Sequence, residues 1–436
     1  MDDLAKRLSI ISFAVIGLIC LIGMLQKRSW LEMFTIGVSL AVAAIPEGLP
    51  IVVTVTLALG VLRMSKRSAI VKKLPSVETL GSVSVICSDK TGTLTTNVMT
   101  VVKVYTVDQG VIDLQANPPL LSTDDALANL FLVGNLCNHS YADRTQQFVG
   151  QATEVALMNV LPKVGLSDAR PFFTKSSEIP FDSETKSQSV TGRFNNGSDR
   201  DTTYMSGATE AILPRCRFYA RSDHSTGSLD ANLAKLVQSK ATELSAQGLR
   251  IVCMASGPDP NALVFHGLQA MMDPPRKGVD QAIAKLHSGG IQVVMITGDS
   301  EATALSIAKQ LGLRVNPGSS GCLLGKDIDL LSQRQLTDRI YGVSVFARTT
   351  PRHKMAIIEA FQTRGAVVAM TGDGVNDAPA LRMADIGVSM GKGGTDVAKE
   401  AADVILVDDN FSTLLPAVEE GKSAFFMSAL SQQAYC

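Results

Sequence analysis

The sequence has almost no net charge and no pattern in its cysteines. Its 436 residues include 40 basic and 41 acidic side chains, which gives a formal charge of -1, so no electrostatic attraction to nucleic acid is expected. The seven cysteines are odd in number and scattered, and they form no CxxC pair. This usage is typical of reduced thiols that face the cytosol. We therefore expect no nucleic-acid partner and no disulfide framework.

Hydrophobic residues, in contrast, make up 46% of the chain and are concentrated near the N-terminus. Residues 8–25 carry no charge and are long enough to cross a bilayer core of about 30 Å. A signal peptide is disfavoured, because two acidic residues precede the run and no small-residue cleavage site follows it. Residues 33–62 contain one charge, Glu47, and the basic cluster at 63–73 places their end in the cytosol. We predict two transmembrane spans, 8–25 and 33–62, in a lipid bilayer, with the N-terminus and the later domains in the cytosol.

Glu47 lies in the segment AIPEGLP, residues 44–50. A lone carboxylate in mid-membrane costs about 2.5 kcal/mol or more on insertion scales, so a functional role is the default interpretation. Pro46 and Pro50 remove helical N–H donors and leave nearby carbonyls unpaired. Such oxygens suit a hard cation, whereas the alternative is a proline kink with a protonated or paired glutamate. The predicted ligands of a transported cation are Glu47 and the carbonyls of Ala43, Ala44 and Ile45.

Three apolar segments each end in an acidic or hydroxyl-rich loop. They are SVSVICSDKTGT at 82–93, IQVVMITGDS at 291–300 and AVVAMTGDGVNDAPA at 366–380. Helical patterns at 278–287 and 301–311 alternate with them, which predicts an α/β fold with a parallel sheet and crossover helices. Ligands bind at the carboxyl ends of such strands. We therefore expect the three loops to converge on one site.

The residues of this predicted site suit phosphoryl transfer. They are Asp89, Asp299, Asp373, Asp377, Thr91, Thr297 and Lys354. Carboxylates bind Mg2+, while a lysine and strand-end hydroxyls hold phosphate oxygens. Asp89 is the candidate nucleophile, because it follows its strand directly and Gly92 lets the loop wrap closely around a phosphoryl group. Asp377 also fits the N-cap of a helix, and Asp299 is expected to cap the helix that begins near Glu301.

These motifs resemble those of the P-type ATPases. The segments DKTGTLT, ITGD, MDPPR and TGDGVNDAPAL carry the resemblance, which implies a haloacid-dehalogenase-like phosphorylation domain whose aspartate is phosphorylated by ATP. The segment from AIPEGLP to DKTGTLTTN is similar to the secretory-pathway Ca2+/Mn2+ pumps of the Golgi, especially fungal ones. A heavy-metal pump would carry a CPC motif in the span, and a proton pump would lack the glutamate.

The resemblance also assigns roles residue by residue. Asp89 is the phosphorylated residue, and Thr297, Gly298, Asp299 and Lys354 complete the catalytic group with Thr91. The implied Mg2+ ligands are Asp89, Thr91, Asp373 and Asp377. The implied ATP pocket consists of Glu154, Phe181, Lys186 and Arg250, although each of these residues taken singly is equally typical of core or solvated surface. Simple phosphatases of this fold carry an acid two residues after the nucleophile; Thr91 cannot act as one, so the acyl phosphate should be long-lived.

The resemblance implies a domain plan with an insertion. Two spans occupy 1–62, the phosphorylation domain is split into 63–97 and 273–421, an α+β nucleotide-binding domain fills 98–272, and 422–436 form a divergent tail. Within the insertion, the segments 187–194 and 202–207 are candidate strands of a hairpin, with Asn196-Gly197 as a turn signal.

The sequence also departs from the family pattern. The family's KGA motif reads Ser206-Gly207-Ala208, no TGES motif is present, and the sequence after AVEEGKS diverges. We expect a fragment of a Ca2+-transporting pump that lacks the actuator domain and the C-terminal spans. The alternatives are a membrane-tethered aspartate phosphatase and a catalytically silent, ATP-binding protein that associates with a pump.

Overall fold

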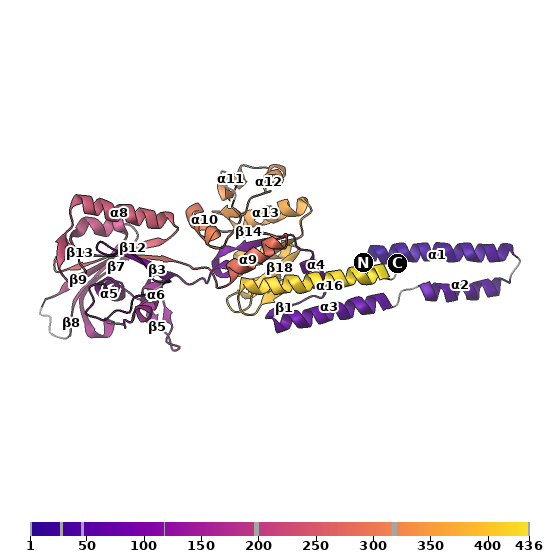
Figure 1. Ribbon diagram of the computed structural model, residues 1–436, viewed down its shortest axis with the longest axis horizontal. Coiled ribbons are helices and arrows are strands. Elements are labelled where there is room, and N and C mark those ends of the chain that lie inside the picture. Colours follow the sequence, from indigo (N-terminus) through magenta and orange to yellow (C-terminus); the bar gives the residue numbers. More distant parts are fainter. Residues whose placement is uncertain are drawn as a thin grey trace. The chain divides into compact units, whose positions relative to one another are not determined.

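The computed structural model describes residues 2–26, 29–44, 48–116, 118–195, 200–315 and 321–434. The chain divides into two compact units (Figure 1). The first comprises residues 1–82 and 416–436, and the second comprises residues 83–415. The second unit contains all three of the predicted strand-end loops.

The first unit is mostly helical. Its elements are α1 (Asp2–Leu25), α2 (Trp30–Ala44), α3 (Gly48–Lys66), β1 (Ala69–Val71), α4 (Pro75–Gly81) and most of α16 (Leu414–Ala434). Arg63 of α3 and Arg67, the residue directly after α3, pair with Glu420 of α16, with N–O distances of 3.2 and 3.7 Å. The hydrophobic run at 8–25 lies within α1, and the run at 33–62 is shared between α2 and α3. Among the residues that the structure describes, no helix combines the length and the hydrophobicity needed to cross a membrane.

The second unit contains a parallel sheet, as the three apolar segments predicted. Its strands run in the order β19-β18-β17-β2-β14-β16-β15. Their bounds are β2 (Val85–Asp89), β14 (Gln292–Ile296), β15 (Cys322–Leu324), β16 (Val345–Ala347), β17 (Val368–Gly372), β18 (Ile386–Met390) and β19 (Val404–Leu406). The segments that carry the motifs are therefore neighbours, because β2 lies between β14 and β17 and pairs with both in parallel.

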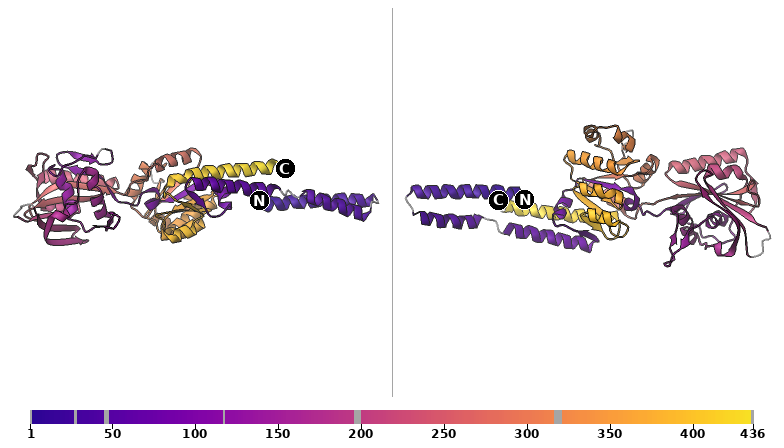
Figure 2. Two further views of the ribbon diagram at one scale, coloured as in Figure 1. Left: turned by 90° about the horizontal axis from the view of Figure 1, so that it is seen from below. Right: turned by 180° about the vertical axis from the view of Figure 1, so that it is seen from behind.

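Helices cover this sheet (Figure 2). They are α9 (Val279–Ser288), α10 (Glu301–Gln310), α11 (Gly325–Asp329), α12 (Gln333–Arg339), α13 (Pro351–Thr363), α14 (Ala378–Met383) and α15 (Asp396–Ala401). Alternate strand residues, such as Val85 and Cys87, share one buried cluster with Ile357 of α13 and Leu381 of α14. Strand residues on the same face recur every second position, so Ile86 is turned to the opposite face. Such double-sided burial explains why these strands are continuously apolar.

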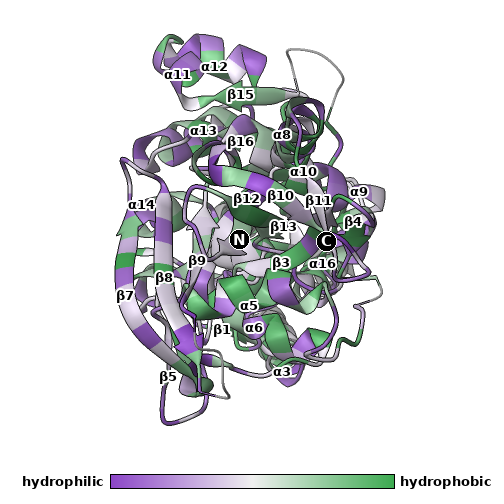
Figure 3. Ribbon diagram, turned by 90° about the vertical axis from the view of Figure 1, so that its left-hand side faces the viewer, coloured by the Kyte–Doolittle hydropathy of each residue, from purple (hydrophilic) through white to green (hydrophobic). Residues whose placement is uncertain are grey.

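The second sheet is mainly antiparallel and is formed by the insertion. Its strands run β11-β10-β13-β12-β9-β8-β7, and β3 pairs with β13 and β4. They are β3 (Thr100–Thr106), β4 (Gly110–Asp113), β7 (Phe173–Asp182), β8 (Ser187–Phe194), β9 (Thr202–Gly207), β10 (Cys216–Ala220), β11 (Thr226–Ser228), β12 (Arg250–Gly257) and β13 (Leu263–Met272). β7 carries hydrophilic residues between hydrophobic ones (Figure 3). The predicted strands 187–194 and 202–207 are β8 and β9 and pair antiparallel, whereas their turn signal, Asn196-Gly197, lies outside the described residues.

Helices pack on this second sheet as well. They include α5 (Ala128–Leu136), α6 (Ala152–Asn159), α7 (Thr209–Ile212) and α8 (Ala231–Ala246). Leu130, Phe131 and Leu136 of α5 are fully buried and share a core with Leu157 of α6 and Met254 of β12. The insertion thus has a hydrophobic core separate from that of the parallel sheet.

Candidate active site

The three predicted loops meet at the carboxyl edge of the parallel sheet. Asp89 is the last residue of β2, and its register partner on β14 is Ile296, which directly precedes Thr297. On the other side, Thr371 of β17 pairs with Ser88 of β2, two residues before Asp373. Parallel pairing in this register brings all three loops to one edge, so the predicted convergence is confirmed.

A buried lysine connects two of the carboxylates. Lys354 Nζ lies 3.0 Å from Asp89 Oδ1 and 2.6 Å from Asp377 Oδ1. The lysine and Asp377 are 6% and 2% exposed. Burial lowers the pKa of Lys354, but attraction to Asp89 and Asp377 outweighs it and the pKa is raised. The ammonium group is therefore held in its charged form between the two acids.

Asp373 joins this group. Ligand oxygens of Asp89, Asp373 and Asp377 all lie within 4.8 Å of one another. Burial raises the pKa of Asp89 to about 6, with Lys354 opposing and Asp377 adding to the rise. Burial and then Asp377 raise the pKa of Asp373 to about 6 as well. Carboxylates that lie this close together repel one another when they are ionised, and a divalent cation bound between them removes the repulsion. The three carboxylates therefore fit a Mg2+ site.

Gly92 brings the loop after β2 close to Asp373. Its φ is +74°, a conformation that glycine adopts without cost, and a Cβ at this position would collide with the Asp373 carboxylate. Arg276 ties down the same loop, since its Nη2 donates to Gly92 O at 2.8 Å and its Nε donates to Thr95 O at 2.9 Å. The close wrapping of the loop, predicted from Gly92, is therefore explained by the positive φ at this residue and by the lack of space for a side chain.

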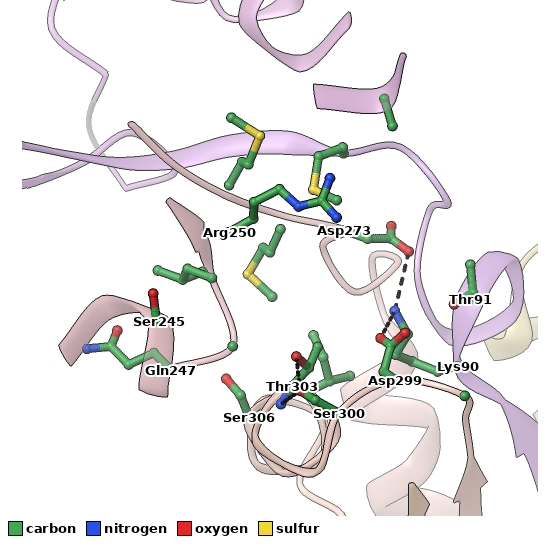
Figure 4. A pocket seen from close by; sticks show the side chains of 18 of the residues that line it. Lys90, Thr91, Ser245, Gln247, Arg250, Asp273, Asp299, Ser300, Thr303 and Ser306 are labelled. Atoms are coloured by element: carbon green, nitrogen blue, oxygen red, sulfur yellow. Dashed lines mark hydrogen bonds and ion pairs between the residues drawn. The ribbon is translucent and has the colours of Figure 1, made fainter. Parts of the chain in front are cut away.

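A cavity of about 620 Å³ opens beside this edge (Figure 4). Thr91, Gly298 and Asp299 line it, together with Arg250 of the insertion. Thr297 is 1% exposed and is not among the residues that line the cavity; its Oγ1 accepts a hydrogen bond from Asp299 N at 3.2 Å. The cavity is thus lined by the loops that follow β2 and β14 and by residues of the insertion.

Lys90 is a charged residue of this region that the sequence analysis did not single out. Its Nζ lies 2.9 Å from Asp299 Oδ2 and 3.8 Å from Asp273 Oδ2 (Figure 4). Asp273 also accepts hydrogen bonds from Thr95 and Thr96. The DKTGT motif placed a lysine beside Asp89, but its direction depends on the path of the loop and could not be read from spacing.

The two predicted helix caps have different outcomes. The prediction that Asp299 caps the helix near Glu301 is wrong, because Ser300 is the N-cap of α10 and its Oγ accepts from Thr303 N at 3.3 Å. Asp299 lies one residue too early and pairs with Lys90 instead. Asp377 does occupy the N-cap position of α14. Its carboxylate makes no capping bond there and is held by Lys354 and by Gly374 N at 3.1 Å.

The four residues of the predicted ATP pocket line one cavity of about 370 Å³ in the insertion. They are Glu154, Phe181, Lys186 and Arg250. Phe181 is half exposed, Lys186 Nζ pairs with Glu210 at 3.0 Å, and Arg250 donates to Thr153 Oγ1 at 2.9 Å. Glu154 is buried, and His139, which the sequence analysis missed, contacts its carboxylate at 3.1 Å. An aromatic ring beside two cations suits a base carrying phosphates.

The predicted cation site falls largely outside the described part of the chain. Ile45 and Glu47 are not among the described residues, and Ala43 and Ala44 are the last two residues of α2. The proposed coordination therefore stays a prediction.

Comparisons with known proteins agree with this geometry. The family model of the P-type ATPase cytoplasmic domain N matches residues 126–278. The haloacid dehalogenase-like hydrolase model matches residues 231–385. A crystal structure of a zinc-transporting PIB-type ATPase superposes with a TM-score of 0.70 over 99% of this chain and 56% of its own. At 22% identity this likeness concerns the fold alone.

Sequence relatives are more similar. Calcium-transporting ATPase 1 of Yarrowia lipolytica is 52% identical over 98% of this chain and 48% of its own length. Calcium-transporting ATPase 1 of Schizosaccharomyces pombe is 50% identical over 98% of this chain and 49% of its own. The human calcium-transporting ATPase type 2C member 1 is 47% identical over 98% of this chain and 47% of its own. The chain spans about half the length of these relatives. From these similarities, and with an aspartate at the carboxyl end of a strand in its parallel sheet, the chain belongs to the P-type ATPase family.

Proposed function

We propose that Asp89 is phosphorylated by ATP, and that the chain is the catalytic part of a Ca2+-transporting ATPase. One observation carries the proposal. Asp89 ends the central strand of a parallel sheet with Lys354 Nζ at 3.0 Å and two further carboxylates beside it. An aspartate in this setting is a nucleophile for phosphoryl transfer.

The residues of the site divide the chemical work. A carboxylate oxygen of Asp89 attacks the γ-phosphorus, the bond to the bridging oxygen breaks, and ADP leaves with the electron pair. With a pKa of about 6, Asp89 is mostly ionised at pH 7, as a nucleophile must be. Lys354 lies where it can balance charge on the transferred phosphoryl group. Mg2+ held by Asp89, Asp373 and Asp377, with Thr91 beside it, would supply further charge neutralisation.

Other residues of this edge position the phosphate. Thr297 and Gly298 directly follow β14, next to the nucleophile, and Asp299 pairs with Lys90 beside the cavity. Thr91 has no acidic group to activate water, so hydrolysis of the acyl phosphate should be slow. A long-lived acyl phosphate suits a pump better than a phosphatase.

The nucleotide is proposed to bind in the insertion. Phe181 offers its half-exposed ring to the base, and Lys186 and Arg250 offer their cations to the phosphates. Glu154 forms the buried wall of the same cavity. Arg250 also lines the 620 Å³ cavity that reaches Lys90 and Thr91. One nucleotide could therefore extend from the insertion toward the phosphorylation edge.

The transported ion is proposed to be Ca2+, or Mn2+, moved from the cytosol into the Golgi or secretory lumen. The relatives named as calcium-transporting ATPases support Ca2+. Glu47 with the carbonyls of Ala43, Ala44 and Ile45 would form part of its site. The exposed apolar side chains of α1 and α2, including Phe13, Trp30 and Phe34, support insertion into a lipid bilayer with the catalytic unit in the cytosol.

The test is phosphoenzyme formation from ATP labelled with radioactive phosphorus at the γ position, with Mg2+ present, detected as acid-stable label. Asp89→Asn should abolish the label because an amide lacks the nucleophilic charge, whereas Asp338→Asn, an exposed position on α12, should retain it. Label persisting on the Asp89→Asn chain would rule this residue out. Rapid loss of label to water would indicate a phosphatase, and ATP binding without any label would indicate a silent binding protein.

A further inference from the structure

A buried histidine, His353, forms part of the first turn of α13. The residue is 6% exposed. Its Nδ1 accepts a hydrogen bond from Thr350 N at 3.2 Å, and its Nε2 lies 2.9 Å from Asp329 Oδ1 of α11. Because a backbone N–H is only a donor, Nδ1 must be unprotonated, so the ring proton is on Nε2 and is donated to the carboxylate. The two contacts therefore select one tautomer of the imidazole.

The contact with Thr350 holds the beginning of the helix. Thr350 is the N-cap residue of α13, and His353 is the third residue of the helix. Glutamate and glutamine at this third position commonly accept a hydrogen bond from the N–H of the N-cap residue. The neighbouring helix α12 has that arrangement, because Gln335 Oε1 accepts from Ser332 N at 2.9 Å. In α13 an imidazole nitrogen does the same work.

Packing against α11 keeps the ring in place. Gly325, the first residue of α11, lies next to the imidazole, since a Cβ at this glycine would be 2.9 Å from Cε1 and Nδ1 of His353. The same Cβ would collide with Arg348 O. The ring is therefore confined by the backbone of α11 and bonded at both of its nitrogens, so its orientation is fixed.

The turn that His353 holds carries a residue of the candidate active site. Lys354 directly follows His353, and its Nζ lies 3.0 Å from Asp89 Oδ1. Thr349, which directly precedes the N-cap residue, donates to Thr297 O through both its N and its Oγ1, at 3.0 and 2.9 Å. The beginning of α13 is thus attached to the loop after β14 and to the proposed nucleophile. A shift of this turn would move the ammonium group relative to Asp89.

We propose that His353 is a positioning residue for phosphoryl transfer, whose Nδ1 fixes the first turn of α13 and so holds Lys354 beside Asp89. The inference rests on the proposed function, in that Lys354 must balance charge on the transferred phosphoryl group. A displacement of about 1 Å in a catalytic group can lower a rate about a hundredfold. Loss of the acceptor should therefore slow the transfer step. ATP binding should be unaffected, because its proposed cavity lies in the insertion.

The test is the rate of phosphoenzyme formation at saturating labelled ATP with Mg2+, with the dissociation constant of ATP measured separately. His353→Leu removes the acceptor at similar volume and should lower the rate about ten- to a hundredfold, with the dissociation constant within about twofold of that of the unaltered chain. His353→Gln restores an acceptor at the third helical position and should recover the rate to within about threefold. No loss in the leucine variant, or an equal loss in both variants, would overturn the proposal.

Gln335→Leu is the matched control. It removes the corresponding acceptor from the first turn of α12, a helix to which no residue of the candidate active site belongs. Its rate should stay within about twofold of that of the unaltered chain. A loss as large as that of His353→Leu would mean that any weakened helix start slows the reaction, and would overturn the specific role of His353.

The tautomer can be measured on the unaltered chain, by the nitrogen-15 chemical shifts of the His353 imidazole at pH 7.5. We expect an unprotonated Nδ1 and a protonated Nε2, and the opposite tautomer would overturn the proposal even where a variant does not fold. Failure of the unaltered chain to form any phosphoenzyme would overturn the proposed function, and this inference with it. Labelling of the unaltered chain together with full labelling of His353→Leu would overturn this inference alone.

Discussion

Replacing Lys354 by methionine should destabilise the parallel sheet at the carboxyl ends of its strands. The substitution keeps the length of the aliphatic stem but removes the ammonium group that lies 2.6 Å from Asp377 and 3.0 Å from Asp89. The buried Asp377 and the partly buried Asp89 then lie near each other without a counter-charge. Breaking a buried ion pair by removing one partner costs about 3 to 5 kcal/mol, because the remaining charge is uncompensated. We expect a loss of stability in that range near pH 7.5.

The loss should depend on pH in a defined direction. The pKa of Asp89 in the folded chain, about 6, lies above its ordinary value of 3.8. A carboxyl with a raised pKa favours the folded state at low pH, and this advantage is lost as the pH rises through the folded pKa. Without Lys354 the pKa of Asp89 rises further, so more of the advantage is lost by pH 7.5. The deficit of the variant should therefore be smaller at pH 5 than at pH 7.5.

Hydrogen exchange measured by mass spectrometry can report the local stability of the strands that carry this site. Peptides that cover β2 and β17 should lose about two to three and a half orders of magnitude of protection at pH 7.5, after correction for intrinsic rates. Lys399→Met is the control, because Lys399 pairs with the exposed Asp396 at 3.6 Å and should change stability by less than about 0.5 kcal/mol. A deficit below about 1 kcal/mol, or one equal at both pH values, would refute the reasoning.

Three further predictions concern the same sites. Gly92 has a positive φ, and a methyl group at this position would collide with Asp373. Gly92→Ala should therefore destabilise the chain by about 1 to 3 kcal/mol, measured by thermal unfolding, and should abolish phosphoenzyme formation, measured by labelling. Labelling equal to that of the unaltered chain would show that the loop adapts to the methyl group. Ser206→Lys should tighten ATP binding by about 1 to 3 kcal/mol, the range for a charged hydrogen bond, and a titration without change would mean that the motif match misplaces the pocket. Mg2+ should raise the unfolding temperature more at pH 7.5 than at pH 5, because Asp89 and Asp373, with pKa values of about 6, are mostly protonated at the lower pH; an equal shift at both pH values would place the ion elsewhere.

The parallel sheet and the meeting of its loops were predictable from sequence. Parallel strands have their carboxyl ends on the same side of the sheet, so polar loops that follow several apolar strands must lie near one another. Asp89, Asp373 and Asp377 are therefore grouped as expected. The strands β8 and β9 were also predicted within their observed bounds. These successes depend on periodicity and on short-range turn chemistry, both of which a sequence displays directly.

Side-chain direction was less predictable. Asp299 and Ser300 are adjacent acceptors, and which of them caps α10 depends on where the chain turns into the helix. The contact between Lys90 and Asp299 depends on the path of the loop around Gly92. The hydrogen bond from Gln188 Nε2 to Ser206 Oγ, at 3.2 Å, depends on the register between β8 and β9, which makes these two residues neighbours. Such facts belong to tertiary structure, and residue spacing does not contain them.

The order of the strands has a consequence for synthesis of the protein. β2 is made first, but both of its neighbours, β14 and β17, come after the insertion. About 200 residues separate β2 from β14, which at roughly 5 to 20 residues per second corresponds to about 10 to 40 seconds on the ribosome. Throughout that interval an apolar strand lacks the partners that bury it, while the insertion, with its separate core, can already fold. A nascent chain arrested before β14 should therefore bind chaperones through the segment that carries the future phosphorylation site.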